Sequence, residues 1–242
     1  MIGASVFAAL IIVFISVLKP FMDYNKAIEL MNAGDDQAAA DYFMALGDYK
    51  NSQEYLTEMC TNNPALKFYI ADVGDVVTLG TYDHGDGIRG IVWYVLAKED
   101  NRVLLMSKYI MDAMESSDIY AWIEKFNNEA FSIDEKKYSK AVLLDIYDAD
   151  RYINALDEDV NMMVKTSPTA RAKVNGIENI YCYYSREYRG YYWWLSGSSN
   201  GRENLVVRAE NTDVPSPSGI VESASEETIC GVRPFAWVEL TK

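Results

Sequence analysis

Tyrosine and arginine alternate in a short stretch between residues 181 and 192. Tyrosine offers rigid contact area with a polar tip, and arginine stacks on aromatic rings, so this composition suits recognition of a carbohydrate or a protein. The competing interpretation is packing, because alternate aromatic residues of a strand face a core. The stretch holds more rings than one strand face can bury. The candidate ligand-binding residues are Tyr184, Arg186, Tyr188 and Arg189, with Asn200 and Arg202 from the loop that follows.

Catalytic and metal-binding patterns are incomplete in this chain. His84 is the single histidine, and a Ser-His-Asp triad would have to use it, yet it lies in a glycine-rich turn without a G-x-S-x-G motif elsewhere. We therefore interpret it as a solvated turn residue. Asp145, Asp148 and Asp150 resemble part of a calcium loop that lacks its central glycine and final glutamate. Asp148 is interpreted as a helix cap, and neither a metal nor another cofactor is predicted.

Two apolar segments bracket a long polar loop near the C-terminal end. The first reads YYWWL over residues 191–195 and is followed by Ser196, and the second reads GVRPFAWV over residues 231–238. This order resembles the C-terminal half of a bacterial domain family of unassigned function, with the pattern W-W-L-R-S, a variable loop and G-V-R-P-A. Further blocks that match the family in the same order begin at about Gly74.

The resemblance implies structural roles for Trp193, Trp194 and Arg233, with Arg233 buried or half-buried at the start of the closing strand. Ser196 stands where the family pattern has an arginine. The layout also resembles C-type-lectin-like and formylglycine-generating-enzyme-like domains, in which a tryptophan-rich strand precedes a closing G-F-R strand. That second resemblance concerns the fold more than the function.

Cysteines offer one enzymatic alternative. The resemblance to formylglycine-generating proteins implies a thiol pair or copper site at Cys182 and Cys230, whose sulfur atoms would have to be close and partly exposed. The chain has three cysteines and no C-x-x-C motif. The competing interpretation is that Cys60, Cys182 and Cys230 are buried free thiols.

Charge excludes some partners. The formal net charge is −14, from 36 acidic and 22 basic residues. Nucleic acids and anionic lipid headgroups attract clustered lysine and arginine, so neither is an expected partner of the soluble part. A chain of 242 residues, half of them hydrophobic, can form one sizeable domain and a smaller element.

The segment Ile2–Leu18 contains no charged residue. Its length in a helix, about 26 Å, approaches the thickness of a bilayer core. We interpret residues 1–22 as an uncleaved transmembrane anchor, with a cleaved signal peptide and a buried soluble helix as the alternatives. The positive-inside rule applied to Lys19 and Lys26 would keep the C-terminal part in the cytoplasm. The acidity and the size of the C-terminal part favour the outer face of the membrane, and we predict that it lies there.

Residues 23–60 have the alternation of small and large side chains of a tetratricopeptide-like helical pair, with a turn at Gly34 and with Leu30 and Phe43 in the seam. Arrays of this kind need at least about three repeats for stability, so we interpret the segment as a spacer.

Residues 61–242 form the predicted main domain, in which the hydrophobic period switches to two. A strand is predicted over residues 73–82 and a hairpin over residues 91–108, followed by helices over residues 119–131 and 148–156. The predicted class is α+β: a mixed, mainly antiparallel sheet with two helices and long loops, with a C-type-lectin-like fold as one form of it.

These observations predict a membrane-anchored recognition module at the bacterial cell surface, with a carbohydrate, cell-wall or protein ligand. A non-catalytic scaffold of an envelope complex and the thiol-dependent enzyme are the alternatives.

Overall fold

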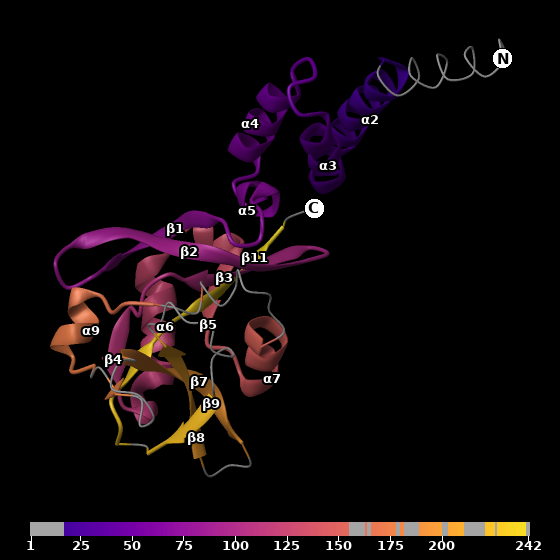
Figure 1. Cartoon of the computed structure of the whole chain (residues 1–242). Helices are drawn as coiled ribbons and strands as arrows, with labels where there is room; N and C mark the ends of the chain where they lie inside the picture. The colour runs from indigo at the N-terminus through magenta and orange to yellow at the C-terminus, as the bar shows by residue number, and fades with distance from the viewer. Residues whose placement is uncertain are drawn as a thin grey trace, which may run out of the picture. The chain divides into compact units, whose positions relative to one another are not determined.

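The computed structural model describes residues 17–154, 163, 166–177, 180–181, 189–199, 203–210, 221–225 and 227–240. This part of the chain consists of two compact units, one of residues 17–70 together with Leu240 and the other within residues 71–239 (Figure 1). The helical unit thus runs through Ile70, beyond the predicted boundary at residue 61. The reason is that Leu66 packs into the helical core.

Four helices build the first unit: α2 (Lys19–Ala33), α3 (Asp36–Leu46), α4 (Ser52–Asn62) and α5 (Leu66–Ile70). The predicted turn after the first helix is confirmed. Gly34 ends α2 at a φ of 80°, a left-handed conformation that glycine adopts without steric cost. The Asp35 carboxylate then accepts a hydrogen bond from the Ala38 N–H at 3.3 Å and so caps α3. Of the two residues predicted to fill the seam between the helices, Phe43 is fully buried and Leu30 is partly buried against the same core.

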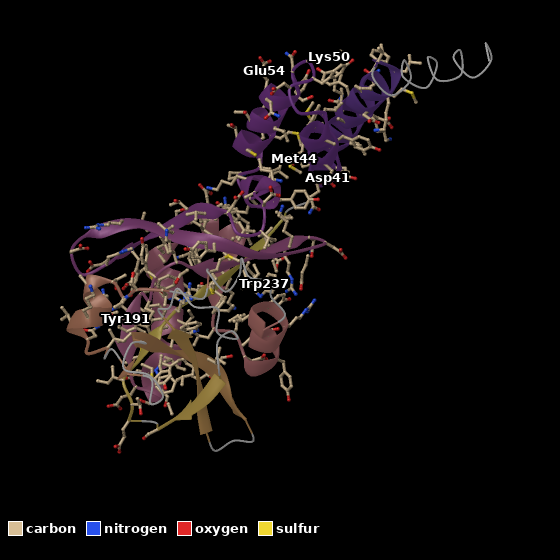
Figure 2. All side chains as sticks on the ribbon, viewed as in Figure 1. Asp41, Met44, Lys50, Glu54, Tyr191 and Trp237 are labelled. Atoms are coloured by element: carbon tan, nitrogen blue, oxygen red, sulfur yellow. The ribbon has the colours of Figure 1, made fainter. Side chains whose placement is uncertain are left out.

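The loop after α3 is tied to the start of α2 by a lysine and aromatic rings. The Lys50 ammonium lies 4.4 Å from the ring centroid of Tyr24, 4.7 Å from that of Phe21 and 5.3 Å from that of Tyr49 (Figure 2). Cations are attracted to the negative faces of such rings, so these contacts stabilise the hairpin.

Residues 2–16 of the predicted membrane anchor lie outside the described residues. Within the described part of the chain, no helix has the length and apolar character needed to cross a bilayer. Apolar side chains are exposed where α2 begins: Val17, Leu18, Phe21 and Met22 are between 48% and 59% exposed. The anchor itself stays a prediction.

The second unit contains a five-stranded antiparallel sheet in the order β1-β2-β3-β11-β5. Its strands are β1 (Val76–Asp83), β2 (Ile88–Glu99), β3 (Arg102–Ser107), β5 (Ser139–Val142) and β11 (Phe235–Glu239). The predicted hairpin is confirmed by β2 and β3, in which Glu99 pairs with Arg102 at the turn. β11 follows the other four strands along the chain but lies between β3 and β5. β5 is therefore an edge strand.

A second sheet has the order β4-β10-β7-β8-β9, with β6 paired to β7. Its strands are β4 (Asp112–Met114), β6 (Ile180–Tyr181), β7 (Arg189–Ser199), β8 (Glu203–Glu210), β9 (Val221–Ala224) and β10 (Cys230–Val232). β10 and β7 are parallel, and the other pairs are antiparallel. Side chains of both sheets, among them Leu104 and Phe235 of the first and Trp193 and Leu195 of the second, form one core.

Three helices accompany the sheets in the described residues: α6 (Ile119–Ala130), α7 (Ile146–Ala149) and α9 (Ala170–Val174). Figure 1 shows α7 and α9 at opposite sides of the unit. The predicted α+β class is confirmed, but the strands form two sheets where one was expected. The cap of α7 also differs from the prediction, because Asp145 accepts the hydrogen bond and the N–H of Asp148 donates it, at 2.8 Å.

Candidate functional site

The surface predicted from the tyrosine–arginine stretch is only partly covered by the structure. Tyr184, Arg186, Tyr188, Asn200 and Arg202 lie outside the described residues. Arg189 is the first residue of β7, where it pairs with Tyr181 of β6. Binding by these residues therefore stays a prediction.

The residues predicted to be structural are buried. Trp193 and Trp194 are at most 1% exposed, and the Trp194 indole N–H donates to the Met114 carbonyl at 2.8 Å. Arg233 is completely buried, and its guanidinium lies 4.9 Å from the centroid of the Trp193 ring. It donates hydrogen bonds to the carbonyls of Ser107, at 2.8 Å, and Met163, at 2.6 Å. Burial lowers the pKa of Arg233 to about 9, so the side chain is still charged at neutral pH.

A second buried ionic group lies around Asp112, which is 2% exposed. Its Oδ2 accepts hydrogen bonds from Trp122 Nε1 and Arg171 Nε, both at 2.9 Å. Its Oδ1 accepts from the Ala113 N–H and from Asn175 Nδ2. These bonds join β4, α6 and α9. The carboxylate is therefore a structural centre, whose hydrogen-bonding capacity is filled by the protein itself.

His84 is buried, and its interpretation as a solvated turn residue is wrong. It is 8% exposed, because its carbonyl accepts a hydrogen bond from the Arg171 N–H at 2.7 Å and α9 thereby covers the turn. In the described part of the chain, no group bonds to its Nε2. Gly85 follows at a φ of 89°, and a Cβ there would lie 2.4 Å from the Arg171 nitrogen. Only glycine permits this approach.

We expect the stability of the protein to fall with pH below 6.5 because of His84. Burial, and then the charge of Arg89, lower the pKa of His84 below its ordinary value of 6.5. The unfolded chain therefore binds a proton at a higher pH than the folded chain, and stability is lost as the pH falls from 6.5 through the folded pKa. Urea midpoints of the wild type and of His84→Gln at pH 7.5 and 5.5 test this. A steeper loss in the variant than in the wild type would contradict it.

A groove lies at the surface of the second unit. Its volume is about 620 Å³, and it lies where α6 meets the edge strand β5 and the middle of β7. The groove is lined by Tyr120, Ile123, Glu124, Asn127 and Asn128 of α6, by Lys136, by Ser139 to Val142 of β5, by Leu143 and by Ser196 of β7. The α6 residues at positions 120, 123, 124 and 127 share one helix face. This face adjoins the buried face of Ile119, Trp122 and Phe126.

The side-chain amide of Asn127 forms hydrogen bonds with the edge of β5 beside this groove. Its Oδ1 accepts from the Ala141 N–H at 2.7 Å, and its Nδ2 donates to the Ala141 carbonyl at 2.8 Å. The same Nδ2 donates to the Ile123 carbonyl at 3.0 Å. The side chain thus pairs with β5 as a neighbouring strand would, and it covers part of an edge that could otherwise pair with another chain.

Asn127→Ala is expected to destabilise the protein by about 1–3 kcal/mol. The change leaves the backbone groups of Ala141 without their partner, which is the cost of an unpaired buried polar group. Denaturant unfolding measures it. Asn128→Ala is the matched control, because Asn128 is exposed on the same helix and surface substitutions change stability by at most about 0.5 kcal/mol. Equal stabilities of the two variants would show that the Asn127 amide has no such role.

The remaining groups of the groove are suited to binding a polar ligand. Tyr120 is 58% exposed. The Lys136 ammonium donates to the Asn128 carbonyl at 2.8 Å, which leaves two of its protons for other acceptors. The Ser196 N–H is used in a bond to the Leu144 carbonyl at 2.8 Å, and its side chain lines the groove. Ser196 stands where the pattern of the family that this chain resembles has an arginine, so that position borders the groove.

No family model, curated protein or solved structure matches this chain. The function of the groove therefore rests on its own residues. Sequence reasoning missed the groove, although one signal was present: the predicted helix over residues 119–131 carries Tyr120 and Asn127 beside its apolar face.

The environment of Cys230 disfavours thiol chemistry. Cys230 is 1% exposed, and burial raises the pKa of its thiol to about 12. A thiolate, which is the nucleophile and the metal ligand, does not form there at neutral pH. Cys182 lies outside the described residues, so its distance from Cys230 is untested. The partial exposure that an enzymatic thiol pair requires is missing at Cys230.

Proposed function

We propose that this protein is a membrane-anchored recognition module of the cell surface and that the groove between α6 and β5 binds its ligand. The observation that carries the proposal is the groove itself. Its volume of about 620 Å³ lies in the range of small-ligand sites. Amide, hydroxyl and ammonium groups surround an exposed tyrosine ring, and such a mixture of polar groups and aromatic contact area supports recognition.

A carbohydrate fits this groove better than an extended peptide. A peptide that adds to a sheet edge needs free backbone groups on the edge strand. On β5 the Asn127 side chain already bonds to both backbone groups of Ala141. A sugar needs no such edge, because its ring can stack on Tyr120 while its hydroxyls exchange hydrogen bonds with asparagine, serine and lysine side chains.

The membrane anchor and a C-type-lectin-like form of the α+β fold are part of the same proposal. The uncharged segment Ile2–Leu18 and the exposed apolar residues at the start of α2 support attachment to a bilayer. The net charge of −14 favours the outer face for the second unit. A C-type-lectin-like architecture is supported by the tryptophan-rich strand β7 and its parallel neighbour β10, which leads to Arg233 and the closing strand β11.

We expect the full chain to bind a member of an array of glycans and peptidoglycan fragments, and Tyr120→Ala to weaken that binding at least tenfold. Tenfold corresponds to about 1.4 kcal/mol, and loss of an aromatic anchor in a recognition site commonly costs at least that much. The melting temperature should be nearly unchanged, because Tyr120 is 58% exposed.

Tyr147→Ala is the matched control, since Tyr147 is 81% exposed and does not line the groove. A combined Tyr184→Ala, Arg186→Ala and Tyr188→Ala variant tests the surface predicted from the sequence. If that variant loses binding while Tyr120→Ala retains it, the groove is not the binding site. If the array is silent, the carbohydrate proposal fails.

A further inference from the structure

The charges of the groove differ from those of the molecule as a whole. The chain carries a net charge of −14. Two lysines, Lys136 and Lys140, line the groove together with one acidic residue, Glu124. A local excess of positive charge in an acidic protein marks the groove as a place where an anion is favoured.

Neighbouring lysines are neutralised, whereas those of the groove are not. Lys137 lies 2.6 Å from a carboxylate oxygen of Asp134, and Lys125 lies 3.8 Å from one of Glu129. Neither Lys136 nor Lys140 has a carboxylate within 4 Å among the described residues. Lys136 is held in place by its bond to the Asn128 carbonyl. Two cations on adjacent segments, η3 (Glu135–Lys137) and β5, thus remain available to a ligand.

We infer that the ligand of the groove is an acidic sugar, whose carboxylate is bound by Lys136 and Lys140 while its ring contacts Tyr120. This inference rests on the proposed binding role of the groove and adds the chemical class of the ligand. The Asn128 amide lines the groove, is neutral, and suits a hydroxyl or acetamido group of the same sugar. The carboxylate has two natural sources, a muramic acid of the cell wall and a uronic acid of a polysaccharide.

The test compares matched disaccharides. N,N′-diacetylchitobiose and N-acetylglucosaminyl-N-acetylmuramic acid differ in the lactyl group that carries the carboxylate, and a disaccharide of glucuronic acid and N-acetylglucosamine represents the second source. The full chain is purified in a detergent without a sugar headgroup, and binding is measured by calorimetry at 50 mM and 300 mM salt. Salt screens exposed charges, so the preference for an acidic ligand should shrink at the higher concentration.

We expect an acidic disaccharide to bind at least about fivefold more tightly than diacetylchitobiose, as one or two exposed ion pairs allow. Lys140→Ala should weaken binding of the acidic ligand about two- to fivefold more than it weakens binding of diacetylchitobiose. Lys137→Ala is the matched control and should change neither, because Lys137 does not line the groove.

Whichever acidic disaccharide binds more tightly identifies the source of the carboxylate, and either result supports the inference. Equal binding of acidic and neutral disaccharides, with no effect of Lys140→Ala, overturns it and leaves the proposed carbohydrate function standing. Absence of binding by all three disaccharides overturns the inference and the carbohydrate function together.

Discussion

Arg233→Ala is expected to lower the free energy of unfolding by about 3–5 kcal/mol, as large truncations in a core do. The buried guanidinium bonds to the carbonyls of Ser107 and Met163 and lies over the ring of Trp193. Alanine removes the donors and leaves both carbonyls buried without them, and each unpaired group costs about 1–3 kcal/mol. It also opens a cavity beside Trp193. Denaturant unfolding of the full chain measures the change.

Two further variants separate these causes. Arg233→Met restores much of the volume without the donors, so it should stay well below the wild type in stability. Arg89→Ala is the control, because Arg89 is 60% exposed and its pairing with Asp86 contributes at most about 1 kcal/mol. An Arg233→Met protein as stable as the wild type would show that volume, and not hydrogen bonding, is what Arg233 contributes.

Asp112→Ala is expected to have an effect of similar size, about 3–5 kcal/mol, because Arg171 loses its buried partner and keeps only the exposed Asp83 carboxylate, at 3.5 Å. Arg171 and Trp122 both donate to the lost carboxylate, and Arg171 itself is 27% exposed. The unfolding transition should also lose cooperativity around α9, which hydrogen exchange of the amides of residues 170–174 can detect.

Asp86→Ala serves as the comparison for this change. Asp86 is 50% exposed and pairs with Arg89 at 2.8 Å, so its removal should alter stability by less than about 1 kcal/mol. If Asp112→Ala is no more destabilising than Asp86→Ala, the hydrogen bonds to Asp112 do not hold α9 in place.

Local patterns were enough to predict several elements. α6 was expected over residues 119–131 and occupies Ile119–Ala130, because Trp122 and Phe126 recur at helical spacing and both are buried. The β2–β3 hairpin and the pairing of α2 with α3 followed from the same kind of short-range signal. In each case the pattern that specifies the element lies within the element or its turn.

Long-range contacts could not be predicted in this way. Asp112 and Arg171 are 59 residues apart, and neither residue type indicates that they meet. The burial of His84 depends on α9, which comes far later in the chain. The groove likewise needs α6, β5 and Ser196 together. Apolar alternation marks a strand but does not specify its neighbours, so the division into two sheets was also missed.

The position of β11 also determines when this protein can fold during its synthesis. β11 lies between β3 and β5, so residues 235–239 must leave the ribosome before the first sheet can close. Until then the nascent chain has two unpaired strand edges, which other chains or chaperones can engage. The helices of residues 19–70 need no such delay, because their contacts are close in sequence. The first sheet of the second unit therefore stays incomplete until β11 has been made, whereas the helical unit can already be folded.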